Sequence, residues 1–140
     1  MDIGHILDKI DYGDEGIKEI IIDVLNNLIR LKLTGLGIFT GKDFDTISYH
    51  DASIVFTEVS RFSFPENSPM PNDFLYAIEL KDVIGEQYYF EICVGGGDNH
   101  SYESRTLFIL ITATGMHIES ATGDIIDIQA HQVTSDSPEP

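Results

Sequence analysis

Residues 17–33, IKEIIIDVLNNLIRLKL, carry two competing patterns of apolar positions. Six apolar side chains from Ile17 to Leu28 repeat at the spacing of a helical stripe. Both halves of the segment also alternate as strands do, and the Asn26–Asn27 pair between them tolerates the positive φ of a tight turn. β-branched residues are dense here, and a helix would leave several isoleucines on its polar side. We therefore predict a β-hairpin over residues 17–33.

A short helix is expected before this hairpin, at residues 2–9, and strands are expected after it. DTISYHDASIVFTEVSRFSF, residues 45–64, alternates between apolar and polar positions, with a possible break at HDA. PENSPMPND, residues 65–73, holds three of the five prolines and is typical of a loop. FLYAIELKDV and QYYFEICVG, residues 74–83 and 87–95, predict two strands joined by a turn at IGE.

The last third of the chain predicts one central strand and one more hairpin. TLFILITAT, residues 106–114, is a nearly continuous apolar run, as expected of a strand covered on both faces. MHIESAT and DIIDIQAH flank Gly123 and predict the final hairpin. The whole chain is then mainly β (α+β), with about eight mostly antiparallel strands in a curled sheet, sandwich or half-barrel.

The chain has 140 residues, which is the size of one domain. We assign residues 1–133 to this single domain and residues 134–140 to a flexible polar tail. The first residues lack a basic segment ahead of an apolar one, so no signal peptide is expected. Apolar runs are far too short to span a membrane, and the single cysteine suits a reducing compartment. These features predict a soluble, cytoplasmic protein.

Charge is the strongest global property of the sequence. There are 24 acidic against 8 basic residues, for a formal net charge of −16, and the excess is spread along the chain. Such a field repels nucleic acid and anionic membranes, since binding to them needs basic side chains. It favours a basic protein partner, whose association it would accelerate. Solubility alone would also explain the acidity, and composition leaves both explanations open.

EICVGGGDNHSYESR, residues 91–105, is the stretch that most resembles a chemical site. It lacks the lysine and the following helix of a phosphate-binding loop, and its glycines do not have dinucleotide-binding spacing. Cys93 is expected to be buried beside Glu91, which would raise the pKa of the thiol and make it unreactive. We predict a structural cysteine and a loop whose glycines supply the positive φ of a wide hairpin turn.

The histidines predict no metal centre. None of the five shows metal-ligand spacing, and the alternative is a site assembled from distant positions, such as His100, His117 and Asp98. His50 and Asp51 are neighbours that point to opposite faces of a strand, so a turn or bulge, with Asp51 binding nearby backbone amides, is the simpler role. We predict no catalytic residue, no metal and no cofactor.

A second candidate site surrounds the proline-rich loop. Aromatic residues and a methionine flank it: Phe62, Phe64, Met70, Phe74 and Tyr76. They either form a recognition surface or cap the edge of the core. The nearby carboxylates Glu58, Glu66 and Asp73 would meet a basic partner. The predicted partner-binding residues are therefore Glu58, Phe64, Glu66, Asp73 and Phe74.

An acidic hairpin, the segment ISYHDASIVF and the paired amphipathic strands after it resemble small acidic bacterial immunity proteins of polymorphic and contact-dependent toxin systems. The resemblance covers residues 15–130 in pattern, and HDASIVF is its one motif. It implies a cytoplasmic protein that binds a toxin and covers its active site. Two alternatives remain: a small β-domain with a ligand pocket between curled sheet faces, and an enzyme whose site is dispersed across strands.

Overall fold

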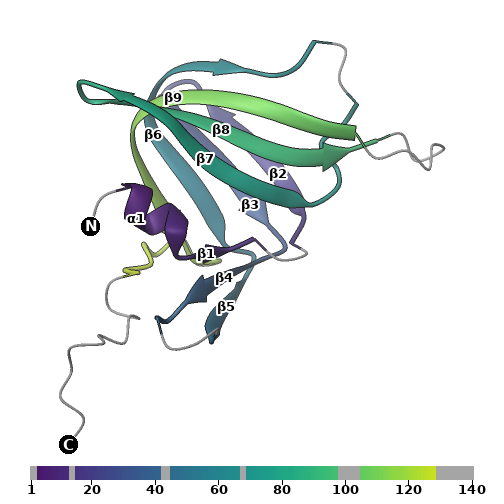
Figure 1. The fold of residues 1–140 in the computed structure, drawn as a ribbon, viewed down its shortest axis with the longest axis vertical. Coiled ribbons are helices and arrows are strands. Elements are labelled where there is room, and N and C mark those ends of the chain that lie inside the picture. Colours follow the sequence, from purple (N-terminus) through teal and green to yellow (C-terminus); the bar gives the residue numbers. More distant parts are fainter. Residues whose placement is uncertain (1–2, 13–14, 42–44, 67–68, 98–104, 129–140) are drawn as a thin grey trace, which may run out of the picture.

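The protein is mainly β in the computed structural model, which describes residues 3–12, 15–41, 45–66, 69–97 and 105–128 (Figure 1). One short helix, α1 (Ile3–Asp8), precedes the strands. The nine strands in these residues are β1 (Ile10–Asp11), β2 (Ile17–Asp23), β3 (Leu28–Leu33), β4 (Gly35–Phe39), β5 (Thr46–His50), β6 (Ser53–Ser63), β7 (Leu75–Ile84), β8 (Gln87–Gly96) and β9 (Arg105–Glu119). The predicted fold class, with its short N-terminal helix, is confirmed.

Six strands form one curled antiparallel sheet, in the order β2-β3-β6-β9-β8-β7. In the described residues, the chain at the starts of its two edge strands, β2 and β7, comes together at one end of the sheet. There, Gly16 and Phe74 form a bridge, and the Leu75 N–H donates to the Glu15 carbonyl at 2.9 Å. We call this line of approach between β2 and β7 the seam. Because the contact stays local, the sheet curls around its core without closing along its length.

The predicted hairpin at residues 17–33 is present as β2 and β3, with Asp23 opposite Leu28. Asn27 has φ 51°, the left-handed conformation that asparagine tolerates. The Asp23 carboxylate accepts hydrogen bonds from the Asn26 backbone N–H at 3.1 Å and from Asn26 Nδ2 at 2.9 Å. The two asparagines therefore act differently: one adopts the turn conformation, and the other is held by the strand before it.

A small sheet of order β1-β4-β5 lies beside the large one (Figure 1). The sequence pattern indicated β5 but neither β1, which has two residues, nor β4, where glycines interrupt the alternation. The chain passes from the large sheet to the small one at Thr34, whose N–H donates to the Gly16 carbonyl at 2.9 Å. Ile10, Leu36 and Ile38 are buried, so the small sheet extends the same core.

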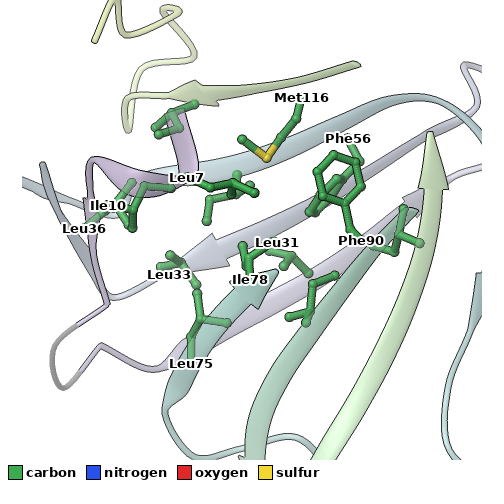
Figure 2. Close-up of a cluster of buried hydrophobic side chains, with 14 of the residues drawn as sticks. Leu7, Ile10, Leu31, Leu33, Leu36, Phe56, Leu75, Ile78, Phe90 and Met116 are labelled. Carbon is green, nitrogen blue, oxygen red and sulfur yellow. The ribbon is translucent and has the colours of Figure 1, made fainter. Parts of the chain in front are cut away.

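The core lies on the inner face of the large sheet. Figure 2 shows Phe56 and Phe90 facing each other, and their ring centroids are 4.9 Å apart in an edge-to-face arrangement. Leu31 and Leu33 from β3 are fully buried, and Leu7 of α1 packs against the same cluster. Side chains of the described residues thus fill the space at this cluster between the curled faces.

β9 lies in the middle of the sheet, yet only one of its faces is buried. Leu107, Ile109 and Ile111 point into the core, whereas Phe108 and Leu110 are each 47% exposed. The prediction of a strand covered on both faces was wrong, because the sheet curls around a single core and leaves its outer face to solvent. An apolar run alone cannot distinguish these two situations.

The predicted last hairpin is only partly formed in the described residues. Gly123 has φ 89°, and the Ile126 N–H donates to the Ile118 carbonyl at 2.8 Å. Glu119 and Ile125 form an isolated bridge, which is not extended into a strand. Residues 129–131 of the predicted hairpin, and the predicted tail, lie outside the described residues.

The glycines of residues 95 and 96 have a different role from the predicted one. Both lie inside β8 and neither has a positive φ, so they do not form the expected hairpin turn. They instead allow the segment before β7 to approach β8. A Cβ at Gly96 would lie 2.5 Å from the Met70 carbonyl oxygen, and one at Gly95 would lie 3.0 Å from Asp73 Cβ.

Replacing Gly96 with alanine should therefore destabilise the protein. The nearest atom to the new methyl is backbone, which cannot move aside as a side chain can, so we expect a loss of about 1–3 kcal/mol in the free energy of unfolding. Gly16→Ala is the matched control, since its Cβ would have no neighbour closer than 3.7 Å. Urea denaturation measures both variants, and equal stabilities would contradict this role of Gly96.

Candidate functional site

A hollow of about 520 Å³ lies along the seam, and we call it the seam slot. One wall comes from β2 and the other from the proline-rich segment that precedes β7. Its lining residues are Ile17, Lys18, Glu19, Ile20, Ile22, Phe64, Pro69, Met70, Pro71 and Asn72. The slot is mostly apolar and open to solvent, which is unusual for a surface of such an acidic chain.

A smaller hollow of about 130 Å³ continues the slot toward the tip of the β2–β3 hairpin. The two hollows share Ile22, and the aromatic rings beside them, Phe62 and Phe64, are in edge contact with centroids 5.9 Å apart. We define the apolar mouth as five large side chains that line one or both of these hollows: Ile22, Val24, Phe62, Phe64 and Met70. All five are exposed, from 37% for Phe64 to 81% for Val24.

The wall opposite β2 is held in place by contacts with the end of β8. Asn72 Nδ2 donates to the Gly97 carbonyl at 3.1 Å, and the Gly97 N–H donates to Asn72 Oδ1 at 3.3 Å. The Asp73 N–H donates to the Gly95 carbonyl at 3.1 Å. Met70 is therefore presented from a backbone that is already fixed, and a ligand at the mouth need not order it.

Carboxylates surround the mouth. Glu19 lines the seam slot, Asp23 lines the smaller hollow, and exposed Glu66 follows Phe64 by two residues. Hydrogen bonds from Asn26 lower the pKa of Asp23, so it is ionised at neutral pH. Among the described residues that line the slot, Lys18 is the one cation, and it forms an ion pair with Asp51 at 2.7 Å. The local charge is negative, as the whole-chain charge is.

The structure brings together some of the predicted partner-binding residues. Phe64 lies in the seam slot, Glu66 follows it, and Asp73 and Phe74 stand at the pinned end of the seam. Glu58 is apart from them: it lies within β6 with φ 49°, and its carboxylate accepts a hydrogen bond from Thr114 Oγ1 at 2.5 Å. The side chains of the aromatic cluster are exposed to solvent.

Sequence reasoning did not assign the β2–β3 hairpin to the site. Ile22, Val24 and Leu25 are exposed there, and Leu25 is 90% exposed. Their signal was present as two apolar residues placed directly before the Asn-Asn turn, where polar residues are usual. The alternation of apolar residues distinguishes a strand from a helix, but the exposure of the turn depends on the fold.

A third hollow, of about 750 Å³, lies on the outer face of the large sheet, and we call it the outer groove. Leu110 contributes apolar surface from the central strand, and Tyr89 and Thr112 add hydroxyl groups. Two cations line it, Arg61 and Lys81. Lys81 is already paired with Glu79 at 2.8 Å and with Glu91 at 3.4 Å, so its charge is largely compensated.

Cys93 is half-buried on this outer face, not fully buried as predicted. Burial raises the pKa of its thiol, and the negative charges of Glu91 and Glu79 add to the effect. The expected direction of the shift is thus confirmed, with desolvation as the larger cause. A thiol with a raised pKa is mostly protonated at neutral pH and is a poor nucleophile.

The predicted break at residues 50–52 is present as a turn, but the Asp51 side chain does not act as predicted. Asp51 has φ 55° and its carboxylate pairs with Lys18 of β2, which lowers the carboxyl pKa. An ion pair links β2 to the start of β6 here, where backbone amides were expected as partners. The ion pair therefore connects a residue that lines the seam slot to the turn that follows β5 of the small sheet.

A cluster that the sequence did not suggest joins β9 to β3. Glu119 accepts from His117 Nε2 at 2.7 Å and from Arg30 at 3.1 Å. Burial acts to raise the pKa of Glu119, but these two partners outweigh it and hold the pKa below the usual range. Within the described residues no group of three or more potential ligands could hold a metal. His100 and Asp98 of the dispersed metal hypothesis lie outside them.

The fold and the site define a class: an acidic antiparallel β protein with one curled, partly open sheet and an apolar mouth at its seam. The model of a family of unknown function, DUF6258, matches residues 1–130, and the chain belongs to this family. No curated protein and no solved structure matches this chain. Among the described helices, none has the length and apolar character needed to cross a membrane.

Labelling of Cys93 should be slow at neutral pH. The half-buried thiol can be reached, so its reaction with iodoacetamide should follow the thiolate fraction, with a midpoint above the ordinary value of about 8.5. Glu91→Gln should accelerate labelling, because it removes a charge that raises the pKa of Cys93. Glu86→Gln, at the β7–β8 turn, is the control. Rapid labelling of the native protein at neutral pH would contradict this assignment.

Proposed function

We propose that this protein is an acidic protein-binding module, and specifically an immunity protein that neutralises a cognate bacterial toxin by covering its active site. The observation that carries the proposal is the apolar mouth, a set of exposed large side chains beside a preorganised wall and surrounded by carboxylates. Soluble proteins seldom expose such a patch without a partner for it. The resemblance to immunity proteins gives the partner its class.

The mouth has the composition of a binding hot spot. Interfaces take most of their affinity from a few aromatic or large apolar side chains near the centre, while surrounding polar residues exclude water. Phe62, Phe64 and Met70 supply such a centre, and Glu19, Asp23 and Glu66 supply the rim. A basic cleft on the partner, such as one that binds an anionic substrate, would match both features.

A protein that inhibits a toxin by covering its active site needs to catalyse no reaction of its own. The inhibitor needs only a surface complementary to the cleft, and we assign it no catalytic residue, metal or cofactor. The bacterial cytoplasm is the compartment where such an inhibitor acts. The alternative, a small ligand in the outer groove, has weaker support because the carboxylates of Glu79 and Glu91 already occupy Lys81.

The proposal predicts protection by this protein against the product of the gene next to its own. That product is expressed in a bacterial host with or without the protein, and growth is measured. We expect growth arrest that the protein relieves, together with a stable complex of the two purified chains. No arrest, or arrest that the protein does not relieve, with no complex formed, would overturn the proposal.

Within that complex, Phe64→Ala should speed dissociation at least about tenfold, because it removes an aromatic anchor from the centre of the interface. Phe108→Ala is the matched control: Phe108 is an aromatic of similar exposure, 47% against 37%, on the outer face of the sheet. Surface plasmon resonance measures both. Equal dissociation rates for the two variants would place the interface away from the mouth.

The rim carboxylates should act on association. Glu19→Gln combined with Glu66→Gln should slow association and reduce its dependence on salt, with a smaller effect on dissociation. Glu86→Gln combined with Asp45→Asn makes the same change in net charge at exposed positions outside the mouth. Glu58→Gln tests the one predicted contact that stands apart. Association that is insensitive to salt would show that the acidity serves solubility alone.

A further inference from the structure

We propose, on the basis of the proposed function, that the partner is bound by strand addition: an extended segment of it pairs with the free edge of β2 and places alternate side chains in the seam slot. Strand addition is a common mode of peptide recognition, in which backbone hydrogen bonds give affinity and pockets for alternate side chains give specificity. Three features of the seam support it here.

The first feature is the unpaired edge of β2. This strand is the first of its sheet, so among the described strands β3 is its only neighbour, and the Gly16–Phe74 bridge lies just before it. The register of β2 with β3 shifts between Ile17 and Glu19, so the regular part of this edge runs from Glu19 to Asp23 and presents one row of backbone groups outside the ladder. Edge strands are templates for pairing unless bulges or charges protect them, and the bulge of β2 lies only at its start.

The second feature is the composition of the wall across the slot. Pro69 and Pro71 have no backbone N–H, and the residues between Met70 and Asp73 are held against β8. A segment of this kind cannot supply a regular ladder to β2. The slot of about 520 Å³ thus separates the edge of β2 from a wall that cannot form regular hydrogen bonds with the backbone groups of that edge.

The third feature is the direction of the β2 side chains. Ile20 and Ile22 pair with Leu31 and Ile29, which are buried, so they point to the inner face and line the slot. Ile21 pairs with Arg30 and points to the outer face. A strand added beside β2 would have the same alternation, with apolar residues inward against Ile20, Ile22 and Met70.

The charges on β2 indicate which residues the added strand should carry on its outer face. Glu19 is exposed on β2, and Asp23 ends the strand as a carboxylate with a lowered pKa. Like charges placed opposite each other across strands are destabilising, and opposite charges are favourable. The incoming segment should therefore alternate apolar residues with lysine or arginine. A second copy of this chain would add Glu19 and Asp23 again, with a net charge of −16 on each copy, and fits less well.

The test uses a synthetic peptide of alternating valine and lysine, equal in length to β2, added to the full-length protein. NMR shifts of the β2 amides report binding. Two N-methylated forms of the peptide carry methyl groups on alternate residues, in opposite phases, so that only one phase removes the N–H groups that face β2. We expect that phase to weaken binding at least about tenfold and the other to leave it within about threefold, since each lost backbone hydrogen bond has a measurable cost.

The protein variant that tests the slot is Ile22→Thr, which keeps a β-branched side chain but reduces the apolar surface. This variant should bind the peptide more weakly. Ile125 is also exposed but lies outside the seam slot, so Ile125→Thr should leave peptide binding unchanged. Equal effects of the two methylation phases, or no shifts in β2, would overturn strand addition. The proposed function would still stand if the complex with the neighbouring gene product formed. A dimer of this chain that the peptide dissociates would overturn the choice of a partner strand.

Discussion

The close contact between the Met70–Phe74 segment and the end of β8 is the constraint on which the seam depends. The Met70 carbonyl lies where a side chain of residue 96 would be, so the contact exists only because that residue is glycine. Backbone hydrogen bonds from Asp73 to Gly95, and from Gly95 to Phe74, complete it. Phe74 and Leu75 then reach Gly16 and Glu15 and pin the two edges of the sheet together at one end.

Because the two edges are held together at one end, the rest of the seam is free to open. Pro69 and Pro71 prevent this part of the chain from continuing as a strand, so the edges separate and the slot opens beyond the bridge. Side chains of β2 that would be buried in a closed sheet remain partly exposed, as Ile22 shows. The exposed apolar mouth is therefore a consequence of how the sheet fails to close, and it is the feature on which the proposed function rests.

The acidic charge and the apolar mouth are complementary. Exposed apolar residues on an edge strand risk pairing between copies of the chain, and a large net charge of one sign opposes that association. The same charge favours a basic partner. The negative charge can thus oppose self-association of the free protein and also favour its association with a basic molecule.

Local patterns were sufficient for much of the fold. The Asn-Asn pair and the β-branched run at residues 17–33 predicted the hairpin, because turn conformation and strand propensity depend on neighbouring residues. The break before β6 and the turn at Gly85 could be predicted for the same reason. Strands β1 and β4 could not, since one is too short and the other too rich in glycine to show a pattern.

The sequence by itself determined the mainly β class, the hairpin pairs, the acidity and the aromatic residues around the proline-rich loop. Only the tertiary structure decided which apolar residues are exposed, because exposure depends on what packs over a strand and not on the strand's own alternation. It placed Phe108 on an open face and Ile22 at an open seam, although both have the apolar character of core residues. It also gave Gly95 and Gly96 their role, since a close approach involves a segment more than twenty residues away in the chain.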